Sequence, residues 1–278
     1  MNALQLLVPA SPLAARPDAR ALLTELPAAL GMALNVRESA RYDDMERELL
    51  AGTAHLGWAP PLVYARVEAY GGRLLARAIR NGSAAYRSAL LLRRGSGVEL
   101  RAGAGLRAAW VDRESVAGFV LPQVVLRDRG LRGWEVFAEE RFVGSYRAAF
   151  DAVMDGSADL CSAPVHAGTV AAARREVELQ AGPGLDVLAL SGACANDGIV
   201  AGPRLGEAQL ESVRRAVLGL HHVTRARRLL ERLFEAERFE LAPEASYREI
   251  YALLLAALPG RAPTARGLQR VFRSARSG

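Results

Sequence analysis

The chain has 278 residues and a formal net charge of +6; hydrophobic residues make up 51% of it and charged residues 24%. This composition is that of a globular protein with one large or two medium-sized domains, and it excludes wholesale disorder, collagen-like repeats and a disulfide scaffold. Apolar runs are shorter than the ~18 residues of a membrane-spanning helix, so we expect no membrane insertion. All 36 basic residues are arginine, a bias typical of a GC-rich genome, and we expect no DNA partner.

The two ends of the chain differ in character. Residues 1–9 lack the basic segment, long apolar segment and cleavage site of a secretory signal, and they resemble a strand. The sequence as written therefore predicts a cytoplasmic location, with a periplasmic one only if an export signal has been removed. Residues 261–278 contain five arginines and no acidic residue. This tail is either a solvated end or the contact for an anionic partner.

Short apolar runs alternate with helical patterns in the first part of the chain. Pro17 suits the first turn of a helix, and Pro27 interrupts that helix. Asp43 and Asp44 suit the positive N-terminal end of another. Strands are expected at residues 4–8, 33–37, 55–58, 74–79 and 86–92, and further helices at 42–50 and 60–70.

The alternation restarts after residue 100 and gives way to helices at the end. Strands are expected at 106–111, 135–138, 159–161, 187–190 and 199–201, and helices at 116–129, 145–154, 167–175, 207–220, 222–237 and 246–258. Two successive βαβα blocks predict an α/β fold with mostly parallel sheets flanked by helices.

The chain passes between the two blocks twice, near residues 86–92 and 188–199. We therefore expect one lobe to contain residues 1–87 plus 198–278, and a second lobe to contain residues 88–197. Two lobes joined by two crossover strands form a cleft with a hinge.

Ligands of open α/β sheets bind outside the carboxyl ends of the strands, where helix N-termini present free N–H groups. Four strand-to-helix turns stand out, and they contain Ser11, Trp58, Ser115 and Ser145. Trp58 either stacks on a ligand or packs against the hinge. Ser115 and Ser145 are predicted N-caps, and Gly118 allows close approach of a backbone.

Five segments carry a family resemblance through their order and spacing. They are Glu48 to Trp58 followed by Pro60 and Tyr64; Tyr86-Arg87-Ser88; Ser115 and Gly118 followed by Pro122; Gly144-Ser145-Tyr146; and Asn196 to Val200. Together they resemble the phosphate/phosphite/phosphonate-binding branch of the type 2 periplasmic solute-binding proteins. The resemblance implies a two-lobed periplasmic-binding-protein type 2 fold that binds a small molecule in the interlobe cleft.

The same resemblance implies ligand contacts, and it shows departures from the family pattern. The phosphonate-cradling turn is usually Ser-Thr-Ser-Gly, where this chain has Ser115, Val116, Ala117 and Gly118; Tyr146 stands where a histidine is common. Three side-chain donors are absent, and each hydrogen bond to a charged group is worth roughly 1.5–3 kcal/mol. We therefore expect a small polar or anionic ligand other than a standard phosphonate.

The remaining candidates each have a structural alternative. Tyr86, at the hinge, contacts ligand or packs. Asp197 holds a ligand amine, as this region can in relatives, or belongs only to a turn. His166 is a general base or a packed side chain. His221-His222 has no acidic or cysteine partner at metal-ligand spacing, so we predict no metal site, and no dinucleotide fingerprint indicates a cofactor.

Three functions remain open. The first is a ligand-binding module that closes over Trp58, Tyr86, Ser115 and Ser145. The second is a cytoplasmic enzyme on the same fold, a dehydratase or lyase acting on a small organic acid. Its candidate residues are His166, Cys194, Asp197 and Tyr146, without an identified nucleophile–base pair. The third is an interaction protein that binds no ligand. The binding module ranks first.

Overall fold

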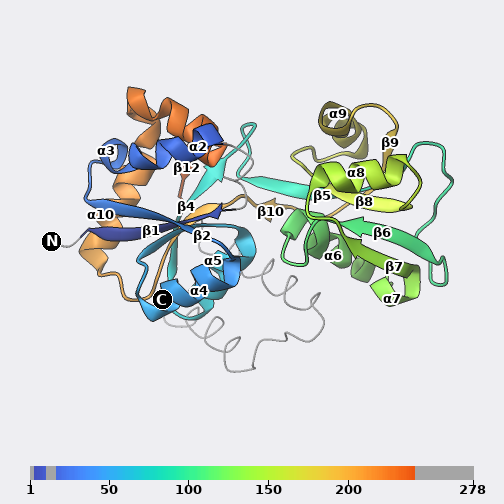
Figure 1. Cartoon of the computed structure of the whole chain (residues 1–278), viewed down its shortest axis with the longest axis horizontal. Helices are drawn as coiled ribbons and strands as arrows, with labels where there is room; N and C mark the ends of the chain where they lie inside the picture. The colour runs from blue at the N-terminus through green and yellow to red at the C-terminus, as the bar shows by residue number, and fades with distance from the viewer. Residues whose placement is uncertain (1–2, 11–16, 242–278) are drawn as a thin grey trace. The chain divides into compact units, whose positions relative to one another are not determined.

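The computed structural model describes residues 3–10 and 17–241, which fall into two units (Figure 1). Unit 1 contains residues 3–10, 17–84 and 195–241, and unit 2 contains residues 85–194. The division lies at Ala85 and Ala195, slightly before the positions 88 and 198 expected from the sequence. As a result, Tyr86 belongs to unit 2 and Asp197 to unit 1.

The sheet of unit 1 has the order β12-β4-β11-β3-β1-β2. Its strands are β1 (Leu4–Pro9), β2 (Leu34–Ser39), β3 (Leu56–Ala59), β4 (Arg73–Ile79), β11 (Gly198–Ala201) and β12 (Arg238–Glu240). β2 and β3 pair parallel with β1, whereas β11 is antiparallel to β3 and β4, and β12 is antiparallel to β4. The carboxyl ends of β1, β3 and β4 therefore share one edge with the amino end of β11.

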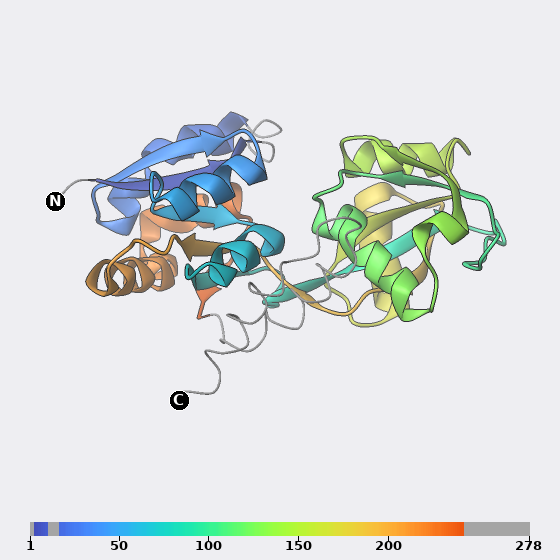
Figure 2. The same cartoon turned by 90° about the horizontal axis from the view of Figure 1, so that it is seen from below.

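Helices cover both faces of this sheet (Figures 1 and 2). On one face lie α2 (Pro17–Ala21), α3 (Leu26–Leu30) and α10 (Glu207–Leu218), over a core that includes Leu6 and Val8 of β1. On the other face lie α4 (Tyr42–Ala51) and α5 (Pro61–Ala69). Here Gly57 of β3 leaves room for Leu49 of α4, because a Cβ at this glycine would lie 3.0 Å from the leucine side chain.

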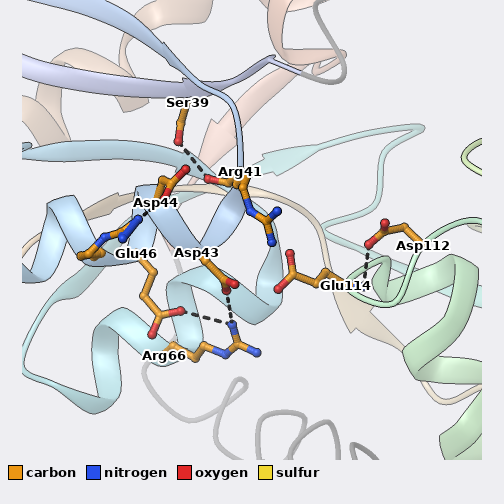
Figure 3. A network of polar contacts seen from close by, with 9 residues as sticks. Ser39, Arg41, Asp43, Asp44, Glu46, Arg66, Asp112 and Glu114 are labelled. Carbon is orange, nitrogen blue, oxygen red and sulfur yellow. Dashed lines mark hydrogen bonds and ion pairs between the residues drawn. The ribbon is translucent and has the colours of Figure 1, made fainter.

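A nearly buried arginine joins the two helices of that second face. Arg66 of α5 is 9% exposed, and its Nη1 lies 3.2 Å from a carboxylate oxygen of Glu46 and 3.6 Å from one of Asp43 (Figure 3). A buried cation is tolerated only when it is paired. The two carboxylates of α4 therefore fix how α5 packs beside it.

The sheet of unit 2 has the order β10-β5-β8-β6-β7, and β9 also pairs with β5. Its strands are β5 (Ala85–Arg93), β6 (Leu106–Trp110), β7 (Phe137–Phe142), β8 (Leu160–Val165), β9 (Leu185–Leu190) and β10 (Cys194–Ala195). β6 is parallel to β7 and β8, and β5 is antiparallel to β8 and β9. The carboxyl ends of β6, β7 and β8 therefore share one edge with the amino end of β5.

Both faces of this second sheet are also covered (Figure 1). α8 (Tyr146–Met154) and α9 (Val170–Ala181) pack over a core that contains Leu91 and Cys161. The opposite face carries η2 (Val116–Val120), a π-helical turn, which continues into α6 (Leu121–Asp128). Trp110 of β6 is fully buried there, and its ring contacts those of Phe119 and Phe137 edge-on, with centroids 5.9 and 5.5 Å away.

The predicted α/β class with two helix-flanked sheets is confirmed. Both sheets are mixed rather than mostly parallel, because β11 and β12 in unit 1 and β5 in unit 2 run antiparallel to their neighbours. The strand expected from residue 135 begins two residues later, as β7 at Phe137. Glu135 and Val136 instead end the short helix α7 (Gly133–Val136), at whose start the Arg132 N–H donates to the Glu135 carboxylate. In the part of the chain that the structure describes, no helix combines the length and the apolar character needed to cross a membrane.

The helix expected at 222–237 is shorter and irregular. After η3 (Leu220–His222), the chain is helical from residue 224 to residue 234, through η4 (Thr224–Ala226) and the π-helical η5 (Leu229–Phe234). Glu235 then adopts a φ of +48°, which ends the helical path and lets β12 add to the edge of β4. The expected helix at 246–258 lies outside the described residues.

Candidate functional site

A small pocket lies at the strand-end edge of unit 1. Its volume is about 70 Å³, and it is lined by Pro9, Tyr42, Trp58, Pro60, Arg80, Asp197, Leu233, Phe234 and Glu235. Trp58 is only 6% exposed, and its ring contacts those of Phe234 and Phe239 edge-on at 5.0 and 5.7 Å. Most of Trp58 therefore packs into the core, while part of it forms a wall of the pocket.

An ion pair forms the polar part of the pocket. Arg80 donates from Nη2 to Asp197 Oδ2 at 2.9 Å and to the carbonyl oxygen of Phe234 at 3.1 Å, and from Nε to that of Glu235 at 3.0 Å. Its guanidinium also lies 5.8 Å from the centroid of the Trp58 ring. Asp197 thus already has a cationic partner from this chain, which the sequence reasoning did not foresee.

Asn196 anchors the crossing that precedes Asp197. Its side chain is fully buried, and Nδ2 donates to the carbonyl oxygens of Ala78 at 3.0 Å and Ser83 at 2.9 Å. Its backbone N–H donates to Ala84. These contacts fix the position from which Asp197 reaches the pocket.

Two capped helix N-termini lie at the strand-end edge of unit 2. Ser115 follows β6, and its Oγ accepts the N–H of Gly118 at 3.1 Å. Ser145 follows β7, and its Oγ accepts the N–H of Ala148 at 3.2 Å. The hydroxyl of Tyr146 lies 3.4 Å from Ser115 Oγ, so the structure brings Ser115, Ser145 and Tyr146 together.

The two residues after Ser115 face the protein interior. Val116 and Ala117 are 5% and 4% exposed, and the carbonyl oxygen of Ala117 accepts the Ser88 hydroxyl at 2.6 Å. The first N–H groups of a helix have no intrahelical acceptor. At this turn, Val116 and Ala117 therefore offer backbone N–H groups instead of side-chain hydroxyls.

A second polar contact shapes the same turn. The carboxylate of Asp112 accepts the N–H of Glu114 at 2.8 Å (Figure 3), which bends the chain immediately before Ser115. Gly118 is required for the tightness of the turn, because a Cβ there would lie 2.5 Å from Ser115 Oγ.

Tyr86 and His166 also lie at this edge, at the start of β5 and just after β8. Tyr86 is nearly buried. The backbone N–H of His166 donates to Glu176 Oε2 at 2.7 Å, and the imidazole Nδ1 lies 3.9 Å from the same oxygen. Cys194 is fully buried, and burial raises the pKa of the Cys161 thiol. Neither cysteine resembles an exposed nucleophile, so the enzyme alternative gains no support.

Two further expectations from the sequence are a ligand contact at Ser11 and the lack of a metal site. Ser11 lies outside the described residues. Within residues 3–10 and 17–241, no group of three or more His, Cys, Asp or Glu side chains is arranged to hold a metal ion. Three residues that line the unit 1 pocket were not among the candidates identified from the sequence: Tyr42, Arg80 and Glu235. Arg80 could have been found, because it immediately follows the predicted strand 74–79.

Comparison with protein families gives a match over most of the chain. Residues 8–247 match the family described as "ABC transporter, phosphonate, periplasmic substrate-binding protein". This match confirms the predicted resemblance. It also makes the expected cytoplasmic location wrong, because the family is the periplasmic component of these transporters. No curated protein matches the chain.

Three solved structures share the fold. A Xanthomonas citri protein bound to ATP has a TM-score of 0.74 at 16% identity, covering 98% of this chain and 99% of its own. A binding-protein component of a phosphonate ABC transporter from Pseudomonas aeruginosa has a TM-score of 0.70 at 14% identity, with coverages of 98% and 95%. A Prochlorococcus marinus protein in complex with methylphosphonate has a TM-score of 0.68 at 16% identity, with coverages of 91% and 97%. These likenesses confirm the two-lobed periplasmic-binding-protein type 2 fold.

Proposed function

Because the chain belongs to the family of periplasmic substrate-binding proteins of phosphonate ABC transporters, we propose that it captures a small organic anion other than a standard phosphonate. The acid group of this anion binds at the strand-end edge of unit 2. The observation that carries the proposal is the pair of hydroxyls of Ser115 and Tyr146, 3.4 Å apart, at the start of the helical segment formed by η2 and α6. Hydroxyl and backbone N–H donors beside a helix N-terminus favour an anion.

The number of donors argues for a singly charged acid group. A phosphonate dianion gives up a strong water shell and needs several donors to replace it. The buried side chains of Val116 and Ala117 supply none. A sulfonate or carboxylate carries one charge, so the smaller set of hydroxyls and backbone N–H groups can compensate for its desolvation.

Thermal unfolding of the purified full chain against paired anions tests this proposal. Methanesulfonate and methylphosphonate have similar shapes and differ in charge; acetate, sulfate, phosphate and ATP complete the panel. A ligand at about 100 times its Kd adds about 2.7 kcal/mol to the stability of the folded state. We expect a concentration-dependent rise of the midpoint with the singly charged organic anions. A larger rise with methylphosphonate, or no rise with any anion, would contradict the proposal.

Two variants test the hydroxyl pair with a bound anion from the panel. Tyr146→Phe and Ser115→Ala each remove a donor to a charged group, worth about 1.5–3 kcal/mol, so we expect roughly 10–100-fold weaker binding. Tyr70→Phe is a matched control at an exposed tyrosine, and Thr169→Ala removes the N-cap of α9. If Ser115→Ala loses stability as Thr169→Ala does but keeps its affinity, Ser115 is only a cap.

A further inference from the structure

The unit 1 pocket is lined by one guanidinium, that of Arg80, and by two acidic residues, Asp197 and Glu235; Arg80 pairs with Asp197. Arg80 and Asp197 lie at the ends of neighbouring strands, β4 and β11, and their side chains are 20% and 28% exposed. Both line the pocket. The carboxylate therefore reaches a cavity that is open to a small molecule, while its charge is compensated from within the protein.

Three hydrogen bonds hold the guanidinium in place. Besides the bond to Asp197, Arg80 donates to the backbone carbonyl oxygens of Phe234 and Glu235. These carbonyls belong to the turn between η5 and β12, where Glu235 adopts its left-handed conformation. A planar guanidinium with acceptors on several sides has a fixed orientation. Arg80 is thus part of the pocket wall, and an incoming group meets it in that position.

The pair decides which charges the pocket accepts. An ammonium group near Asp197 would compete with a fixed guanidinium and be repelled by it. A second anion near Arg80 would be repelled by Asp197. The remaining wall includes Trp58, two prolines, Leu233 and Phe234, which favour an apolar group, together with Tyr42 and the exposed Glu235.

We infer that Arg80 is a specificity-determining residue, which acts as the internal counter-ion of Asp197 and denies this carboxylate to an organic cation in the unit 1 pocket. Without Arg80, the same pocket becomes a site for an organic cation, because Asp197 then lacks its partner. This inference replaces the expectation that Asp197 holds a ligand amine.

Chemical rescue tests the pocket without knowledge of the natural ligand. Arg80→Ala removes the side chain beyond Cβ, and ethylguanidinium has the size and charge of the missing part. We expect millimolar ethylguanidinium to raise the unfolding midpoint of Arg80→Ala with saturation and to leave the wild-type midpoint unchanged. The double variant Arg80→Ala/Asp197→Asn should lose this rescue. Arg73→Ala is the matched control and should show no rescue. Arg73 lies on β4, the strand that ends just before Arg80, and forms an exposed ion pair with Glu207 of α10.

Two rescue results would overturn the inference. They are an unchanged midpoint of Arg80→Ala in ethylguanidinium, and an equal rise in the double variant. If Arg80→Ala does not fold, Arg80→Gln keeps a polar side chain at the site. It should bind ethylammonium in calorimetry at least tenfold more tightly than wild type does, and equal affinities would overturn the inference.

Discussion

Replacing Gly118 by alanine should damage both the stability of unit 2 and the turn that we propose binds an anion. A Cβ at this position would lie 2.5 Å from Ser115 Oγ and 2.8 Å from the Cβ of Val111. Side-chain atoms do not approach that closely, so the turn must open. The movement strains or breaks the hydrogen bond from the Gly118 N–H to Ser115 Oγ, which is the N-cap of η2.

Two costs add in this variant. Loss of an N-cap costs about 1 kcal/mol, and overpacking a closed site costs about 1–3 kcal/mol. The sum of about 2–4 kcal/mol corresponds to a decrease of the thermal midpoint of roughly 5–15 °C. Gly168 is the matched control, because it lies in the same unit, has no atom within 4 Å of a Cβ and has no positive φ.

Calorimetric unfolding of the two alanine variants checks this prediction. Gly168→Ala should unfold within about 1 kcal/mol of wild type, since an alanine there meets no obstacle. Gly118→Ala should also bind the anion of the panel more weakly, because Ser115 is displaced. If Gly118→Ala unfolds at the wild-type temperature, the turn accommodates a side chain and the reasoning about its tightness is refuted.

Three further predictions concern the framework of the two units. The hydrogen bond from Arg107 lowers the pKa of Asp159. The stability that this carboxylate contributes is therefore present above about pH 4 and is lost as the pH falls through its folded-state pKa. Below about pH 4, the free energy of unfolding in urea should depend less on pH in Asp159→Asn than in wild type. Arg66→Ala should lower the free energy of unfolding by about 1–3 kcal/mol in the same assay, which is less than for a fully buried pair, because its partners are partly exposed. Arg47→Ala removes an exposed ion pair and should lower it by about 0–1 kcal/mol. Leu49→Ala should cost about 2–5 kcal/mol, because Leu49 is fully buried; a cost below 1 kcal/mol would contradict its place in the core.

Local sequence determined most of the elements and the two capped turns. Apolar runs identified strands such as β1 and β5, since a buried strand needs little besides consecutive apolar residues. Ser115 and Ser145 were identified as N-caps because capping involves only the next three residues of the same helix. The rule that ligands bind at the carboxyl ends of strands then predicted a site at the edge of unit 2 where both turns lie.

The tertiary structure decided the ion pair of the unit 1 pocket. Arg80 and Asp197 are 117 residues apart, and only the antiparallel addition of β11 beside β4 brings them together. No local pattern encodes that pairing. The end of unit 1 shows the same limit: the helical pattern after residue 222 does not indicate the positive φ of Glu235, which ends the helix before β12 pairs with β4. Helix periodicity and capping are local properties of this sequence. The charge of its pocket depends on strand order, because strand order sets which distant side chains meet.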